Sequence, residues 1–164
     1  MEDQLAMAMM GDGAHEDCLT CRANRGELIT PGGVIYEDGL WRLEHSQPIP
    51  MVGWLILKPL RHVEAFADLT PDEAASLDPL VRRITGAMTE VLAPARVYVC
   101  LYAEAVSHVH FHLIPRYHET PREHWGPGVF DLLSAASDQE RSLAEVEAAE
   151  RAAASIRERL GKHP

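Results

Sequence analysis

The chain has 164 residues, of which 46% are apolar, so it is long enough for one globular domain with a buried core. Its formal net charge of -10 at pH 7 would repel a phosphate backbone, which argues against DNA or RNA as the main partner. The start Met1-Glu2-Asp3 is not the basic start of a secretory signal, and no stretch approaches the roughly 18 apolar residues of a membrane span. We therefore expect a cytoplasmic protein with no membrane partner.

The N-terminal region divides into a tail and a cysteine pair. Residues 1–16 are rich in Met, Ala, Gly and acids without a periodic apolar face, which predicts a flexible tail. Cys18 and Cys21 follow with Cys-x-x-Cys spacing. In a reducing compartment two thiolates from one tight turn can occupy adjacent corners of a zinc tetrahedron. A pair of ordinary reduced thiols is the alternative.

The next apolar segments predict three strands. Residues 34–38 and 40–45 are predicted to be the two strands of a hairpin. They meet at the dipeptide Asp38-Gly39, which is favoured in two-residue hairpin turns. The continuous apolar run 53–59 is typical of a strand that is covered on both faces.

A helix is predicted from Thr70 to about Leu92. The sequence TPDE at its start supplies an N-cap, a proline at the first helical position and a glutamate that can complete a capping box. Apolar residues then recur with helical spacing. Pro79 is unfavourable inside a helix, so we expect a kink or a restart near Asp78.

The C-terminal part predicts two more strands and a helix. Residues 96–103 are β-branched and aromatic, and residues 107–117 alternate polar and apolar, so the two segments should pair through a short turn around Glu104. The pattern SDQE at 137–140 is another capping box and begins an amphipathic C-terminal helix that ends at Gly161. This order predicts an α+β fold with a mostly antiparallel sheet of about five strands, one main helix and the C-terminal helix.

Three alternate residues near the end of the last strand are histidines. On a strand, His108, His110 and His112 would lie on one face about 6.6 to 6.8 Å apart. Imidazole is a good nucleophile toward phosphorus at neutral pH, and neighbouring groups can fix its tautomer. A His-rich polar strand face is one alternative, and a metal bound by all three histidines is another.

The run HVHFHLI at 108–114 is a complete match to the His-φ-His-φ-His-φ-φ signature of the histidine triad (HIT) family, in which φ is apolar. Residues 53–73 resemble the strand, Pro, His and helix-start segment of the family, and the resemblance covers roughly residues 17–117. It implies a HIT-like fold in a homodimer. We expect the HIT domain at 17–130 and a C-terminal helical extension at 131–164.

The resemblance also implies a chemistry. Family members are nucleotide hydrolases and nucleotidyl transferases that act at an α-phosphorus through a nucleotidyl group carried on the middle histidine. That catalytic role is assigned to His110, and contact with the phosphate or the leaving group is assigned to His112. The expected partner is a nucleotide or another phosphate-containing small molecule. The related galactose-1-phosphate uridylyltransferases are a further alternative, but their His-Pro-His-Gln pattern is absent.

A zinc site is implied in the same way. Some HIT proteins complete a Cys-x-x-Cys zinc site with a histidine after the third strand and the first histidine of the triad. The corresponding residues make the implied metal ligands Cys18, Cys21, His62 and His108. A Cys₂His₂ shell leaves no vacant position, so this zinc would be structural and would fasten the N-terminal segment to the strand that carries His110.

Two departures from the family affect substrate binding. Members often carry Gly-Gln-Ser/Thr before the triad, but residues 103–105 are Ala-Glu-Ala. A carboxylate at Glu104 would repel phosphate unless it is protonated or paired, for instance with Arg61 or Arg116. A ribose-binding aspartate of the family is replaced by Ser46. The predicted substrate-binding residues are Glu104, Ser107, Ser46 and Trp54, of which Trp54 could offer a stacking face or serve in the core.

The sequence thus predicts a zinc-containing hydrolase or nucleotidyl transferase that cleaves a phosphorus-oxygen or phosphorus-nitrogen bond at an α-phosphate through a covalent His110 intermediate. The alternative is a non-catalytic relative that keeps the zinc-stabilised fold and binds a ligand or a partner. The missing phosphate donors favour that alternative.

Overall fold

A computed structural model describes residues 16–137 and 141–161 and contains a five-stranded antiparallel sheet in the order β1-β2-β3-β5-β4. The strands are β1 Val34–Glu37, β2 Trp41–His45, β3 Leu55–Pro59, β4 Arg96–Leu101 and β5 Phe111–Arg116. The α-helices are α2 Leu19–Asn24, α3 Pro71–Leu92, α4 Phe130–Ser137 and α5 Leu143–Gly161. Short 3-10 helices lie at Phe66–Asp68, Arg122–His124 and Gly126–Val129. The predicted α+β architecture is confirmed.

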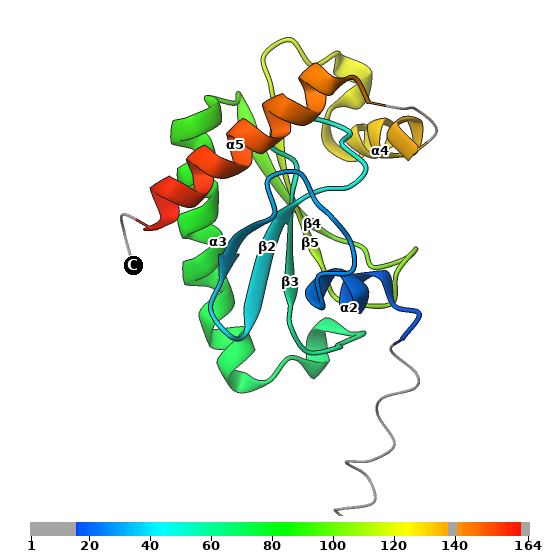
Figure 1. Ribbon diagram of the computed structural model, residues 1–164, viewed down its shortest axis with the longest axis vertical. Helices are drawn as coiled ribbons and strands as arrows, with labels where there is room; N and C mark the ends of the chain where they lie inside the picture. Colours follow the sequence, from blue (N-terminus) through cyan, green and yellow to red (C-terminus); the bar gives the residue numbers. More distant parts are fainter. Residues whose placement is uncertain (1–15, 138–140, 162–164) are drawn as a thin grey trace, which may run out of the picture.

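The helices form layers on the two faces of the sheet. Helices α3 and α5 pack on each other and cover one face, whereas α2 and α4 lie on the opposite side (Figure 1). The main core lies under α3 and α5 and includes Leu43, Leu55, Ile84, Leu113 and Ile156. A smaller cluster of Trp54, Ile114 and Val129 lies on the other face, where α4 packs.

The β1–β2 hairpin is closed by the Asp38 side chain. Its Oδ1 accepts hydrogen bonds from the backbone N–H groups of Leu40 at 3.0 Å and Trp41 at 2.8 Å. Gly39 has φ of 87°, a left-handed conformation that favours glycine. The connection therefore includes Leu40 and is longer than the predicted two-residue turn.

Helix α3 begins with the predicted capping box. The Thr70 hydroxyl accepts from the Glu73 N–H at 3.2 Å, and the Glu73 carboxylate accepts from the Thr70 N–H at 2.7 Å. The helix is continuous through Pro79, so the predicted restart near Asp78 is wrong. Pro79 and Ala75 are exposed, so water can satisfy the Ala75 carbonyl that loses its usual donor.

The C-terminal region differs from the prediction in its boundaries. Ser137 ends α4, a helix that the sequence analysis did not predict, and residues 138–140 lie outside the described residues. Helix α5 begins after Ser142, whose hydroxyl accepts from the Glu145 N–H while the Glu145 carboxylate accepts from the Ser142 N–H. The capping box thus uses the second of two Ser-x-x-Glu patterns. The predicted tail also lies outside the described residues, apart from Glu16.

Strands β4 and β5 pair as predicted, but the connection between them is long. The pairing ends at Leu101 opposite Phe111, so residues 102–110 form a loop instead of a short turn. Within the described residues, no helix has the length and apolar character needed to cross a membrane.

Candidate functional site

The histidine run begins in the 102–110 loop and ends on β5. Only His112 belongs to the strand, because the ladder with β3 stops at Phe111. Val109 lies outside that ladder, and a 2.6 Å hydrogen bond from its N–H to Val63 O holds it instead. The predicted row of three histidines on one strand is therefore wrong. His108 and His110 lie on a bent segment, and this bend separates their surroundings.

His108 joins the cysteines instead of the other two histidines. One ligand atom from each of Cys18, Cys21, His62 and His108 lies within 4.8 Å of the other three. The Nδ1 atom of His108 is 3.5 Å from each sulfur, and the Nδ1 atom of His62 is 3.3 Å from Cys21 Sγ. Ligands at ordinary zinc distances are separated by about 3.3 to 3.8 Å in a tetrahedron, so the cluster fits a zinc ion.

The contacts of the Nε2 atoms of His62 and His108 support this arrangement. His108 Nε2 donates to Pro59 O at 3.2 Å, and His62 Nε2 lies 3.3 Å from the Glu64 carboxylate. Such contacts leave Nδ1 unprotonated and directed at a metal. Burial lowers the pKa of His108 to about 4, so it is neutral at pH 7. Burial, reinforced by Cys18, raises the pKa of Cys21 to about 11, so a cation is needed to hold its thiolate.

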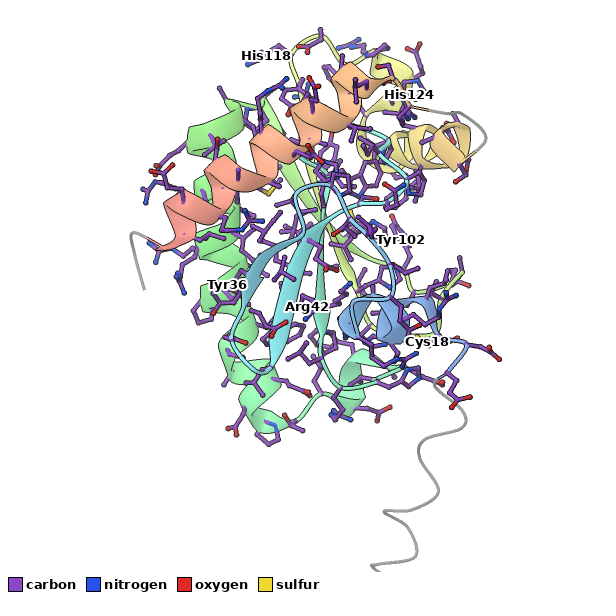
Figure 2. All side chains as sticks on the ribbon, viewed as in Figure 1. Cys18, Tyr36, Arg42, Tyr102, His118 and His124 are labelled. Atoms are coloured by element: carbon purple, nitrogen blue, oxygen red, sulfur yellow. The ribbon has the colours of Figure 1, made fainter. Side chains whose placement is uncertain are left out.

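Helix α2 places the two cysteines. Cys18 is its N-cap residue and Cys21 lies one turn later, so both sulfurs are on one side of the helix (Figure 2 labels Cys18). Asn24 donates from its amide to the carbonyl of Pro59 at 2.9 Å. Arg42 donates to the Asn24 carbonyl at 2.8 Å. The sequence predicted only a tight turn at the cysteine pair, because a helix of six residues is too short to show helical periodicity.

The tautomer of His110 follows from a single contact. Its Nδ1 lies 2.6 Å from the carbonyl oxygen of His108. Because a carbonyl can only accept, Nδ1 carries the proton and the Nε2 lone pair is available. Burial lowers the pKa of His110, which favours this neutral form. No group among the described residues bonds to Nε2, so His110 has the form that a nucleophile requires.

The tautomer of His112 is the reverse. The Trp54 indole N–H, which can only donate, lies 3.0 Å from His112 Nδ1. The proton of neutral His112 is therefore on Nε2, where it can donate to a ligand. Burial, followed by the charge of His110, lowers the pKa of His112 to about 4. The two rings are 5.0 Å apart, so an acceptor and a donor nitrogen lie side by side.

Aromatic residues enclose His112. Phe130, the first residue of α4, packs edge-on against His112 at 5.1 Å and against Trp54 at 5.5 Å. Tyr102 packs on Phe130 at 4.9 Å and lies on the side of the molecule where α2 and α4 lie (Figure 2). Phe130 was not among the residues predicted from the sequence, because its contact with His112 depends on how the 118–130 segment folds back onto β5.

A buried ion pair lies beside His110. On β3, Ile56 is opposite His112, so Lys58 extends the same face toward His110. The Lys58 ammonium is 2.5 Å from the Glu44 carboxylate, and both side chains are 5% exposed. Burial lowers the pKa of Lys58, and Glu44 opposes that effect. After burial, the charge of Lys58 also lowers the pKa of His110.

The predicted substrate-binding residues have different surroundings. Glu104 and Ser107 are exposed in the 102–110 loop. Trp54 is fully buried, so it reaches the site through its bond to His112 and offers no exposed stacking face. Ser46 is buried and donates to the Pro48 carbonyl at 2.9 Å.

Neither arginine expected to neutralise Glu104 does so. Arg61 pairs with Glu73 at 2.9 Å, and Arg116 lies over the Trp125 ring.

The comparison with protein families agrees with the site. A family model of the HIT domain matches residues 29–119, which is more than half of the chain. The chain therefore belongs to the HIT family. The match contains His62, His108, His110 and His112 but begins after Cys18 and Cys21.

Three solved structures have the same fold. A Hit-like protein involved in cell-cycle regulation from Bartonella henselae is 19% identical, with 87% of this chain and 96% of that chain covered and a TM-score of 0.63. A zinc-bound histidine triad family protein from Mycobacterium smegmatis is 18% identical, with 89% and 94% covered and a TM-score of 0.64. A hypothetical histidine triad nucleotide-binding protein from Sulfolobus tokodaii is 18% identical, with 88% and 93% covered and a TM-score of 0.66.

Proposed function

We propose that this protein is a hydrolase or nucleotidyl transferase that cleaves a phosphorus-oxygen or phosphorus-nitrogen bond at the α-phosphate of a nucleotide. The observation that supports it most is the opposite tautomers of His110 and His112, which set a lone pair beside an N–H donor. The family membership supports the same chemistry, and the nucleotide-binding name of the Sulfolobus tokodaii relative is consistent with it.

The proposed reaction has two steps. The Nε2 lone pair of His110 attacks phosphorus, a P–N bond forms, and the leaving group departs with the electron pair of its bond and takes a proton from water. The Nε2–H of His112 donates to a phosphate oxygen and stabilises its developing charge. Water or another acceptor then attacks phosphorus, and the P–N bond breaks to restore neutral His110.

The proposed zinc is structural. It is bound by all four residues of the Cys₂His₂ cluster, so it links α2 to the 102–110 loop, which carries His110. Purified protein should contain about one zinc per chain, and the double variant Cys18→Ser, Cys21→Ser should lose both the metal and stability. Cys100→Ser is the matched control, because Cys100 lies on β4 outside the cluster. Retention of zinc by the double variant would exclude this site.

The decisive experiment for catalysis is capture of the intermediate. Incubation with a panel of nucleotides and dinucleoside polyphosphates should give a nucleotidyl adduct by intact mass, which peptide mapping places on His110. His110→Ala should abolish the adduct, whereas His118→Ala, which changes an exposed histidine, should not. An adduct that persists in His110→Ala would reject the assigned nucleophile.

A non-catalytic ligand-binding role is the second candidate, because Glu104 stands exposed where relatives often carry an amide. Glu104→Gln removes the charge and restores the amide at nearly constant size. If repulsion limits ordinary nucleotides, the variant should bind or cleave them more strongly. Absence of any adduct in both the parent protein and Glu104→Gln, with tight nucleotide binding retained, would favour the binding role.

A homodimer in the cytoplasm stays a prediction from the sequence.

A further inference from the structure

Arg116 is a buried cation at the end of β5. The residue is 8% exposed, and its Nε is buried without a hydrogen-bond partner. Its Nη1 donates to the Tyr117 carbonyl at 3.3 Å. Within the part of the chain that the structure describes, no carboxylate forms an ion pair with it. A buried charge without a counterion is strongly unfavourable, so Arg116 lacks a partner that its surroundings require.

Arg122 lies against the same indole ring as Arg116, and Arg96 is the ladder partner of Arg116. Its Cζ is 4.4 Å from the centre of the Trp125 ring, and the Cζ of Arg122 is 5.3 Å from the same centre. Arg96 is directly opposite Arg116 in the β4–β5 ladder, so their side chains share one face of the sheet. Stacking on an indole offsets only part of the repulsion between guanidinium ions.

The acidic residues near Trp125 in the chain do not neutralise these cations. Glu119 and Glu123 are exposed, and neither forms an ion pair with Arg96, Arg116 or Arg122 in the described structure. The chain has a net charge of -10, yet this end of the sheet presents an arginine cluster without a described counterion.

The loop that carries Trp125 is held in place. The indole N–H donates to the Thr120 carbonyl at 2.9 Å, and the Gly126 N–H donates to the Tyr98 hydroxyl at 3.1 Å. A Cβ atom at Gly128 would meet the Glu123 carbonyl oxygen at 2.1 Å, so the loop closes tightly only with glycine there. The contact of the ring with both guanidinium groups is thus built into the fold.

We propose that Arg96, Arg116 and Arg122 form a binding site for a phosphate group. The planar fork of arginine matches phosphate oxygens, and several guanidinium groups suit a dianion better than a single carboxylate. The ligand is inorganic phosphate or the terminal phosphate of a small molecule.

This site is distinct from the histidine site. Arg116 follows His112 by four residues on β5, which is about 13 Å along a strand. The apolar cluster that contains Ile114 and Val129 lies on the same face of the sheet. His118 and His124, which belong to the loop around Trp125, lie at the end of the molecule remote from Cys18 (Figure 2).

Trp125 supplies a direct readout. It is 41% exposed, whereas Trp41 and Trp54 are fully buried, so a quenching or spectral shift that Trp125→Phe removes is assigned to Trp125. Titration of the full chain with inorganic phosphate at constant ionic strength should give a saturable fluorescence change at millimolar concentrations or below. Trp125→Phe should abolish the signal while binding, followed by phosphorus NMR, persists.

Variants test the assignment to these arginines. Arg122→Gln, an exposed change that should leave the fold intact, is expected to weaken phosphate binding about tenfold. Arg151→Gln removes the same charge from an exposed position on α5 and should have little effect. His110→Ala should bind phosphate with unchanged affinity, because the histidine site is separate. If glycerol phosphate, a phosphate monoester without a nucleoside, competes no better than phosphate, the ligand is the free ion; tighter binding of glycerol phosphate indicates the phosphate of a larger molecule.

Two results would overturn the proposal. One is the absence of a saturable signal by both fluorescence and phosphorus NMR. The other is an equal loss of affinity in Arg122→Gln and Arg151→Gln, which would show that only the overall charge matters.

Discussion

At the residue scale, His110 and His112 differ through the partner of one ring nitrogen each. A carbonyl oxygen fixes the proton of His110 on Nδ1, and an indole N–H keeps Nδ1 of His112 unprotonated. Neutral imidazole has one donor and one acceptor nitrogen, so these contacts decide which nitrogen faces a substrate. The same residue type thereby presents a free lone pair at one position and a free N–H at the next, as the proposed nucleophile and hydrogen-bond donor require.

The first prediction separates His110 from His108. His110→Ala should abolish turnover and leave zinc content and melting temperature nearly unchanged, because His110 is outside the metal cluster. His108→Ala should lose zinc and stability together, since it removes one of four ligands. Elemental analysis and thermal melts measure both effects. If both variants lost metal equally, the division of roles between these histidines would be wrong.

The second prediction concerns the buried pair of Lys58 and Glu44. Lys58→Met should destabilise the fold by about 3 kcal/mol or more, because it leaves the Glu44 carboxylate buried and unpaired. The double variant Lys58→Met, Glu44→Leu should recover most of that loss, which urea denaturation can measure. Its activity then isolates the effect of the Lys58 charge near His110. A double variant as unstable as the single one would contradict this account.

At the scale of elements, α4 determines how His112 is held. Its first residue, Phe130, contacts His112, Trp54 and Tyr102, so one ring joins β5, the start of β3 and the 102–110 loop. The domain boundary predicted at 130 puts Phe130 inside the HIT domain and the rest of α4 in the predicted extension. The contacts of Phe130 make the start of α4 part of the surroundings of the site.

The third prediction tests that role. Phe130→Ala should lower the free energy of unfolding by about 2 kcal/mol and also reduce turnover, because His112 loses a packing partner. Leu133→Ala is the control, since Leu133 packs on the same apolar cluster without a described contact to His112. It should lower stability with a smaller effect on turnover. Equal ratios of turnover loss to stability loss in the two variants would argue against a positioning role.

Element boundaries also show what local patterns leave open. The sequence contains Ser-x-x-Glu at 137–140 and again at Ser142, and both satisfy the capping-box pattern. Only the second begins α5. The capping box at Thr70, by contrast, was predicted correctly because Pro71 follows it and fixes the first helical position.

At the scale of the whole molecule, the two faces of the sheet differ in the residues that they carry. The apolar core lies under α3 and α5, and the opposite face carries the metal cluster, the histidine pair and the arginine cluster in succession. Burial on that second face also makes stability depend on pH. Burial lowers the pKa values of His108, His110 and His112 below those of an unfolded chain.

The fourth prediction follows from His112, whose pKa is about 4 in the fold and about 6.5 in an unfolded chain. Between these values the unfolded chain binds a proton that the folded chain does not, so stability should fall as pH falls from about 6.5 to 4. The slope from one such group is at most about 1.4 kcal/mol per pH unit. Urea denaturation at fixed zinc concentration can measure it.

His112→Asn provides the matched test of that slope, because its side-chain oxygen can still accept from Trp54 but does not titrate. The variant should have a shallower pH dependence than the parent, whereas His118→Asn, which changes an exposed histidine, should match the parent. Parallel curves for His112→Asn and the parent would show that His112 does not carry this effect.

The sequence by itself determined the family signature, the antiparallel arrangement and the start of α3, because each depends on spacing along the chain. The resemblance to the HIT family that this signature carries supplied the set of four metal-ligating residues. Only the tertiary structure decided that the three histidines do not form a row on one strand, because β5 begins at Phe111 and both His108 and His110 precede it in the 102–110 loop. It also decided that Lys58 meets Glu44 and that Arg116 meets Trp125. Local patterns specify neighbours within a few residues, whereas strand register and loop closure specify neighbours across the fold.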